Sequence, residues 1–192
     1  MNSEVLDRRV RKTRTKLRQC LAELLKTKSI HEITVTELAK MADINRGTFY
    51  LHYRDVYDLL EHIEADILKE FHALLTHSTP AMEHLAPFIE IMLSFIQENS
   101  DIFRLFMENK TNSDFPGKLR EELKRTVFQN WASQIRRRNL SQFELYYEFA
   151  LNGTLGMIEN WLRNEQTMKP GELSLLIEEF IQGGLTRVIE RG

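Results

Sequence analysis

Residues 34–60 of the chain read TVTELAKMADINRGTFYLHYRDVYDLL. Thr34 stands three residues before Glu37, the spacing at which a Thr hydroxyl and a Glu carboxylate cap each other's backbone amides, so a short helix is expected to begin there. The helical pattern breaks at 43–45, and another short helix is expected over 46–52. Two short helices joined by a three-residue turn form a helix-turn-helix.

Helical periodicity dominates outside this motif as well. Residues 8–26 have the pattern of an amphipathic helix, with leucines on one face and basic residues on the others. From residue 55 onward the apolar spacing predicts a long helix and then a bundle, and only eight Gly and four Pro interrupt the whole chain. The sequence therefore predicts an all-α protein, with a three-helix helix-turn-helix DNA-binding domain at 1–54 and a helical effector-binding and dimerisation domain at 55–192.

The formal net charge of −2 hides an asymmetry between these two parts. Residues 1–54 hold twelve Lys and Arg against six Asp and Glu, whereas residues 55–192 hold fourteen against twenty-two. A basic segment on an acidic body is typical of a protein that meets a polyanion at one end. Nucleic acid is the leading candidate for that polyanion.

The chemistry of residues 45–48 suits the major groove of double-stranded DNA. A recognition helix enters the groove with its N-terminal residues leading, which places Asn45, Arg46 and Thr48 near base edges and phosphates. Gly47 lets the backbone come close to the duplex. We expect Arg46 to Thr48 to carry most of the sequence specificity.

The remaining residues of this helix have two different roles. Phe49 and Tyr53 lie four residues apart and are expected to point back into the core. Tyr50 and His52 can donate hydrogen bonds to phosphates, and such contacts fix the position of a protein on the duplex.

The run at 34–60 resembles the TetR/AcrR family of bacterial transcriptional regulators almost position by position. The residues that this resemblance places near bases or the nearby backbone are Thr36, Arg46, Gly47 and Thr48, and those that it places on phosphates are Tyr50 and His52. The resemblance also implies a homodimer joined by its last two helices, with a ligand pocket in each C-terminal domain.

Two residues depart from the family pattern. Asp43 stands where a turn glycine is usual, but Asp tolerates the left-handed conformation, so the turn is expected to survive. Val56 stands where the family commonly has a phosphate-binding lysine, which removes one phosphate contact from each subunit unless Arg54 replaces it.

An effector pocket is expected between the bundle helices, because apolar pockets with a few polar groups usually lie there. The candidate lining residues are Phe95, Phe103, Phe106, Met107, Trp131, Tyr146 and Asn152. Plain core packing is the alternative for most of them.

The last two predicted helices, 143–162 and 173–189, are the most apolar of the chain. An apolar helix face of this length would promote aggregation if it stayed exposed. The simplest partner to cover it is the same helix pair of a second copy of the chain. The candidate dimer-interface residues are Gly153, Gly156, Ile177, Phe180, Ile181, Leu185 and Val188.

Several kinds of chemistry find no support in the sequence. Cys20 is the only cysteine, which excludes an intrachain disulfide, and its helical spacing favours a buried structural thiol. The histidines show no recognised metal spacing, and there is no nucleophile motif or phosphate loop. We therefore expect no metal, no cofactor and no enzymatic activity. The absence of a signal peptide and of a membrane span favours a cytoplasmic protein associated with the nucleoid.

The leading hypothesis is a homodimeric repressor that binds a palindromic operator and is released by a small apolar effector. The alternative keeps the DNA-binding part but makes the C-terminal half a docking module for a protein partner, so that the protein acts as an activator or organiser. An apolar cavity of several hundred Å³ would favour the first hypothesis. A filled core with an exposed groove would favour the second.

Overall fold

A computed structural model describes residues 3–77, 84–107, 113–134, 140–164 and 167–190, and in these ranges it contains helices and no strand. The predicted all-α class is confirmed. The first helices are α1 (Ser3–Leu25), the 3₁₀ turn η1 (Ile30–Glu32), α2 (Val35–Met41), α3 (Arg46–Tyr50) and α4 (Val56–His77). They are followed by α5 (Ala86–Glu98), α6 (Ser100–Met107), α7 (Phe115–Leu123), the π-helical segment η2 (Lys124–Phe128), α8 (Gln129–Ala132), α9 (Leu140–Arg163) and α10 (Pro170–Glu190).

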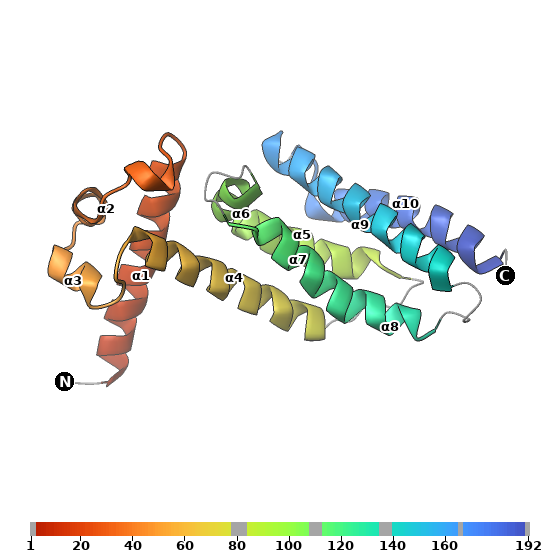
Figure 1. Ribbon diagram of the computed structural model, residues 1–192, viewed down its shortest axis with the longest axis horizontal. Helices are drawn as coiled ribbons and strands as arrows, with labels where there is room; N and C mark the ends of the chain where they lie inside the picture. The colour runs from red at the N-terminus through yellow and green to blue at the C-terminus, as the bar shows by residue number, and fades with distance from the viewer. Residues whose placement is uncertain (1–2, 78–83, 108–112, 135–139, 165–166, 191–192) are drawn as a thin grey trace. The chain divides into compact units, whose positions relative to one another are not determined.

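The described residues form two compact units. The head unit comprises those of Met1–Ile67 and Leu105–Ser113, and the bundle unit comprises those of Leu68–Arg104 and Asp114–Gly192. α4 begins in the head unit and ends in the bundle unit. Figure 1 shows α1, α2 and α3 at the red end of the chain and the helices of the bundle unit toward the blue end.

Leucines of α1 and the first residues of the helix-turn-helix make the core of the head unit. Leu17, Leu21, Leu38 and Phe49 are completely buried. Cys20 is buried beside them, and burial raises the pKa of its thiol. The pattern of apolar residues in α1 therefore packs where the sequence predicted.

The cap of α2 forms in part as expected. The backbone amide of Glu37 donates to the Thr34 hydroxyl over 3.2 Å. The Glu37 carboxylate accepts a hydrogen bond from the Lys28 ammonium over 2.5 Å. At the start of η1, the Glu32 carboxylate accepts hydrogen bonds from the amide (2.8 Å) and the hydroxyl (3.1 Å) of Ser29, and these bonds lower the pKa of Glu32. These caps fix where η1 and α2 begin.

The turn between α2 and α3 is closed by Asp43. Its φ is +53°, the left-handed conformation that favours glycine. The amide of Asp43 donates to the carbonyl of Lys40, and the amide of Ile44 donates to that of Ala39. This pair of bonds is a Schellman motif, which needs a left-handed residue at this position. Asp43 supplies that conformation in place of glycine, and the turn survives as expected.

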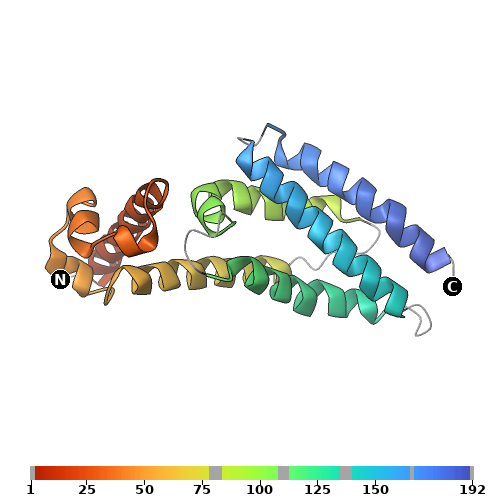
Figure 2. The ribbon, with the colours of Figure 1, turned by 45° about the horizontal axis from the view of Figure 1, so that its top comes forward.

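In the bundle unit, α9 and α10 run side by side in opposite directions, and α5 packs against α10 (Figure 2). A carboxylate of α10 caps the start of α5: Glu178 Oε1 accepts hydrogen bonds from the amides of Leu85 (2.5 Å) and Ala86 (3.0 Å). α5 has no side-chain cap of its own. Since charge-assisted hydrogen bonds to helix N-termini are strong, Glu178 stabilises the packing of α10 against the start of α5.

The segment 115–132 is α-helical at both ends and is interrupted by a π-helical turn at 124–128. Leu119, Leu123, Val127 and Trp131 are spaced by four, and in an α-helix each such step drifts by about 40° around the axis. A π-turn is wider and offsets that drift. Three of the four, Leu123, Val127 and Trp131, consequently line one cavity.

Aromatic contacts with α9 accompany the π-turn. Phe128 stacks on Phe143 with ring centroids 5.6 Å apart and an angle of 15° between the rings, and it meets Tyr147 edge-on at 4.9 Å. These partners lie far along the chain. The π-turn therefore depends on tertiary packing that local sequence patterns do not encode.

Candidate functional site

The short helix α3 has one buried face and one exposed face. Phe49 is completely buried and Tyr53 is 5% exposed, and their rings pack with centroids 5.7 Å apart. Arg46, Gly47 and Tyr50 lie on the exposed face. The two buried rings anchor the helix on the head unit, which leaves the opposite face open for a macromolecule.

The N-terminus of α3 is capped by Asn45. The Gly47 amide donates to Asn45 Oδ1 over 2.8 Å, so this predicted DNA-contacting side chain has a structural role in the free protein. A Cβ at Gly47 would meet only Asn45 Oδ1, at 3.4 Å. The surface above Gly47 is open, as close approach of the backbone to DNA requires.

Two of the predicted base-contacting residues meet each other across α2 and α3. Arg46 Nη1 donates to the Thr36 hydroxyl over 3.1 Å, and both residues are exposed. Thr48, the third residue of α3, is half-buried. The fold thus brings Thr36, Arg46 and Thr48 to the start of the recognition helix.

The predicted phosphate-contacting residues follow at the end of α3. Tyr50 is 56% exposed and its ring meets Phe49 edge-on at 5.7 Å. His52 is half-buried, with its ring 6.2 Å from that of Tyr53. Both side chains are held against core rings, which limits the conformational entropy that they lose on binding.

Arg54 is engaged by a carboxylate at the start of α4. Its Nη2 and Nε donate to Asp58 Oδ1 over 2.7 and 3.1 Å, and its amide donates to Asp58 Oδ2 over 2.9 Å. These bonds lower the pKa of the buried Asp58 carboxyl. Val56 is 3% exposed and belongs to the core. A phosphate contact from Arg54 would have to compete with the Asp58 pair.

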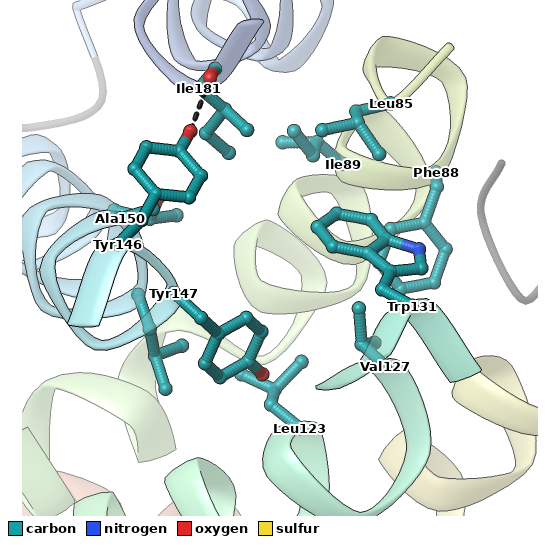
Figure 3. Close-up of a pocket in the computed structure, with 12 residues that line it drawn as sticks. Leu85, Phe88, Ile89, Leu123, Val127, Trp131, Tyr146, Tyr147, Ala150 and Ile181 are labelled. Atoms are coloured by element: carbon teal, nitrogen blue, oxygen red, sulfur yellow. Dashed lines mark hydrogen bonds between the residues drawn. The ribbon is translucent and has the colours of Figure 1, made fainter. Parts of the chain in front are cut away.

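The bundle unit contains an apolar cavity of about 100 Å³ (Figure 3). No charged side chain lines it, and burial raises the pKa of the Tyr147 hydroxyl, which stays neutral. The Tyr146 hydroxyl donates to the carbonyl of Ile181, drawn as the dashed line in Figure 3. The lining residues are Leu85, Phe88, Ile89, Leu123, Val127, Trp131, Tyr146, Tyr147, Ala150, Leu151, Thr154 and Ile181.

Of the seven candidate pocket residues, Trp131 and Tyr146 line this cavity. Phe103 and Phe106 are at most 1% exposed, and the half-buried Phe95 packs on Phe71 and Phe103. Met107 is half-buried. Asn152 is exposed and accepts a hydrogen bond from Arg120 over 3.2 Å. The α5 part of the lining was missed, because its place depends on helices distant in sequence.

An exposed apolar face runs along α9 and continues on α10. Leu145 and Phe149 are 74% and 77% exposed, and Phe180 is 66% exposed. Gly153 and Gly156 follow on the same side of α9, and nothing lies within 4 Å of a Cβ built on either. Among the other dimer candidates, Ile177 is completely buried and Ile181 lines the cavity, while the side chains of Leu185 and Val188 lie outside the described residues.

No cluster of three or more His, Cys, Asp or Glu within the described ranges is arranged to hold a metal ion. None of the helices that the structure describes is both long and apolar enough to cross a bilayer.

The sequence pattern of the transcriptional regulator C-terminal region of TetR proteins matches residues 83–183, which is more than half of the chain. The chain belongs to the TetR family. As a member with an N-terminal helix-turn-helix, it is a DNA-binding transcriptional regulator. The predicted family is therefore confirmed.

Curated relatives of this TetR-family regulator are distant. It is 25% identical over 173 residues to the uncharacterized HTH-type transcriptional regulator YxbF of Bacillus subtilis, a match that covers 86% of this chain and 43% of YxbF. It is 23% identical over 167 residues to the nucleoid occlusion factor SlmA of Shewanella sp. (strain W3-18-1), covering 79% and 84%. The regulator thus spans less than half the length of YxbF.

Solved structures share its fold. A TetR transcriptional regulator from Streptococcus agalactiae 2603V superposes with a TM-score of 0.61 at 22% identity, over 94% of this chain and 99% of that one. FadR from Bacillus subtilis, in complex with stearoyl-CoA, superposes with a TM-score of 0.61 at 19% identity, over 88% and 98%. At these identities the similarity establishes the fold of the TetR-family regulator.

Proposed function

We propose that this regulator is a repressor that binds a palindromic operator as a homodimer and leaves it when a small, neutral, apolar effector binds. Residues 1–54 would bind the DNA in the nucleoid of the cytoplasm, and residues 55–192 would hold the effector and the dimer contact. The observation that carries the effector proposal is the uncharged lining of the cavity (Figure 3). A charged ligand would lose its hydration there without compensation.

The size of the cavity bounds the effector. A cavity of roughly 150 Å³ lined by apolar side chains binds benzene. The cavity of about 100 Å³ is smaller than that, and it is also below the several hundred Å³ that would favour the effector hypothesis by size, so the effector proposal rests on the uncharged lining. Compounds of one aromatic ring or a short hydrocarbon chain are therefore the class to test.

Release requires that the effector bind the DNA-free state more tightly than the DNA-bound state. α4 is the helix that would transmit effector binding in the bundle unit to the DNA-binding head unit, because it contributes residues to both units. An effector that alters the packing around the cavity would shift α4 and thereby the spacing of the two recognition helices in a dimer.

Filling the cavity tests this proposal. Ala150 lines the cavity, and Ala150→Phe is expected to keep operator binding but to abolish release by a panel of small neutral aromatic compounds. The measurement is fluorescence anisotropy of the operator with increasing compound. Gln129→Phe, at an exposed position of α8 outside the cavity lining, is the control and should release like the wild type. If no compound releases the wild-type protein, the effector proposal fails.

The exposed face of α9 and α10 supports the homodimer. Phe149→Glu is expected to convert a dimer to a monomer and to weaken operator binding, because the dimer would bury an unpaired charge. Sedimentation of the full chain measures the change. Asn164→Glu, at the exposed residue that directly follows α9, is the control. A wild-type chain that sediments as a monomer on and off DNA contradicts the arrangement.

An open groove supports the second candidate function, an activator or organiser that docks a protein partner. The groove lies between α5 and the start of α10, and its volume is about 640 Å³. The similarity to a nucleoid occlusion factor also agrees with an organiser. DNA binding that is insensitive to every small compound but changes on addition of a protein would favour this candidate.

A further inference from the structure

Leu51 is the most exposed large hydrophobic residue in the part of the chain that the structure describes. It exposes 81% of its surface, more than Phe149 with 77% or Leu145 with 74%. Those two residues belong to the apolar face along α9, whereas Leu51 directly follows the recognition helix α3. Single exposed leucines are common on protein surfaces, so the residues around Leu51 decide whether it has a role.

Leu51 continues the exposed face of α3. It is the C-cap residue with helical φ and ψ of −70° and −19°, and its amide donates to the Gly47 carbonyl over 3.1 Å. Residues four apart lie on the same helical face, one turn above the other. Leu51 is therefore stacked on Gly47, on the side away from the buried Phe49.

Gly47 leaves room for the leucine side chain. Side chains on a helix lean toward its N-terminus, so the Leu51 side chain is directed toward the turn at which Gly47 stands, without coming within 4 Å of a Cβ built on Gly47. Gly47 has no side chain, and nothing but Asn45 Oδ1 would contact a Cβ there. The centre of this face is thus apolar, with the polar groups of Arg46 and Tyr50 next to it on the helix.

The base edges in the major groove offer one apolar group, the 5-methyl of thymine. We propose that Leu51 packs on the 5-methyl group of a thymine in each half-site and thereby specifies that base. The proposal rests on the DNA-binding function of the head unit and adds a specificity residue that hydrogen-bonding chemistry alone does not reveal.

Deoxyuridine tests the proposal, because it differs from thymidine only by the missing 5-methyl group. A duplex enriched from random DNA by the full-length protein is prepared with each thymine replaced singly by deoxyuridine. One position per half-site is expected to weaken wild-type binding by about 3- to 5-fold, the effect of losing one buried methyl group. With Leu51→Ala, the same replacement is expected to have no effect.

The controls separate this contact from other causes. Leu175→Ala removes another exposed leucine, 63% exposed and in the bundle unit, and should respond to deoxyuridine like the wild type. The role of Leu51 is overturned if Leu51→Ala leaves the effect of every deoxyuridine replacement unchanged. This includes the case in which Leu51→Ala weakens binding to all sequences equally. A wild-type protein that enriches no sequence would overturn sequence-specific DNA binding itself, and this assignment with it.

Discussion

Arg46→Ala is expected to remove about 1 to 3 kcal/mol of discrimination per half-site, since a guanidinium that reads a base does so through paired hydrogen bonds. A dimer on two half-sites would lose roughly twice as much. Arg46 is exposed at the start of α3 and lies against Thr36. The measurement is the dissociation constant on the enriched duplex and on variants with single base-pair changes.

Arg46→Lys is the matched variant for this prediction. It keeps the positive charge but not the planar pair of donors, so it should preserve binding to random DNA while losing discrimination. If Arg46 instead contacts a phosphate, both variants should leave the sequence preference intact. The alanine variant should then weaken binding to all duplexes equally. It should also reduce the slope of log K against log salt concentration by about one.

Phe49→Ala is expected to destabilise the head unit by about 3 to 5 kcal/mol, the usual effect of truncating a fully buried aromatic ring. Phe49 is completely buried against Tyr53 and Tyr50. Hydrogen exchange of the amides in α1 to α3 measures the loss. Both tryptophans, Trp131 and Trp161, lie in the bundle unit, so their fluorescence reports that unit separately.

The neighbouring residue provides the control. Tyr50→Ala removes a ring that is 56% exposed and should weaken DNA binding with little change in the exchange of the α1 to α3 amides. Equal exchange behaviour of the two variants would show that α3 is not anchored through Phe49.

The helix-turn-helix was predictable from sequence because its signals are local. The Thr34 cap, the left-handed Asp43 and the spacing of Phe49 and Tyr53 each act within a few residues. The Arg54–Asp58 pair also has a local signal in the sequence, a basic and an acidic residue four apart.

The cavity was only partly predictable, because long-range packing creates it. Trp131 and Tyr146 were among the candidates, whereas Leu85 and Ile89 join them through the contact of α5 with α10. The π-turn at 124–128 has the same origin, in contacts of Phe128 with α9. Composition identifies such residues as apolar, but only the tertiary fold distinguishes a cavity wall from plain core.

The hydrogen bond between Arg46 and Thr36 has a consequence for how the regulator searches a chromosome. On random DNA the guanidinium can stay with the Thr36 hydroxyl, while other basic residues of the head unit hold the phosphates and allow sliding. At the correct base pair we expect it to exchange this one partner for two acceptors on the base. We therefore expect an Arg46 side chain that is hydrogen-bonded to Thr36 to leave the protein weakly bound while it scans DNA, so that tight binding waits for the correct sequence.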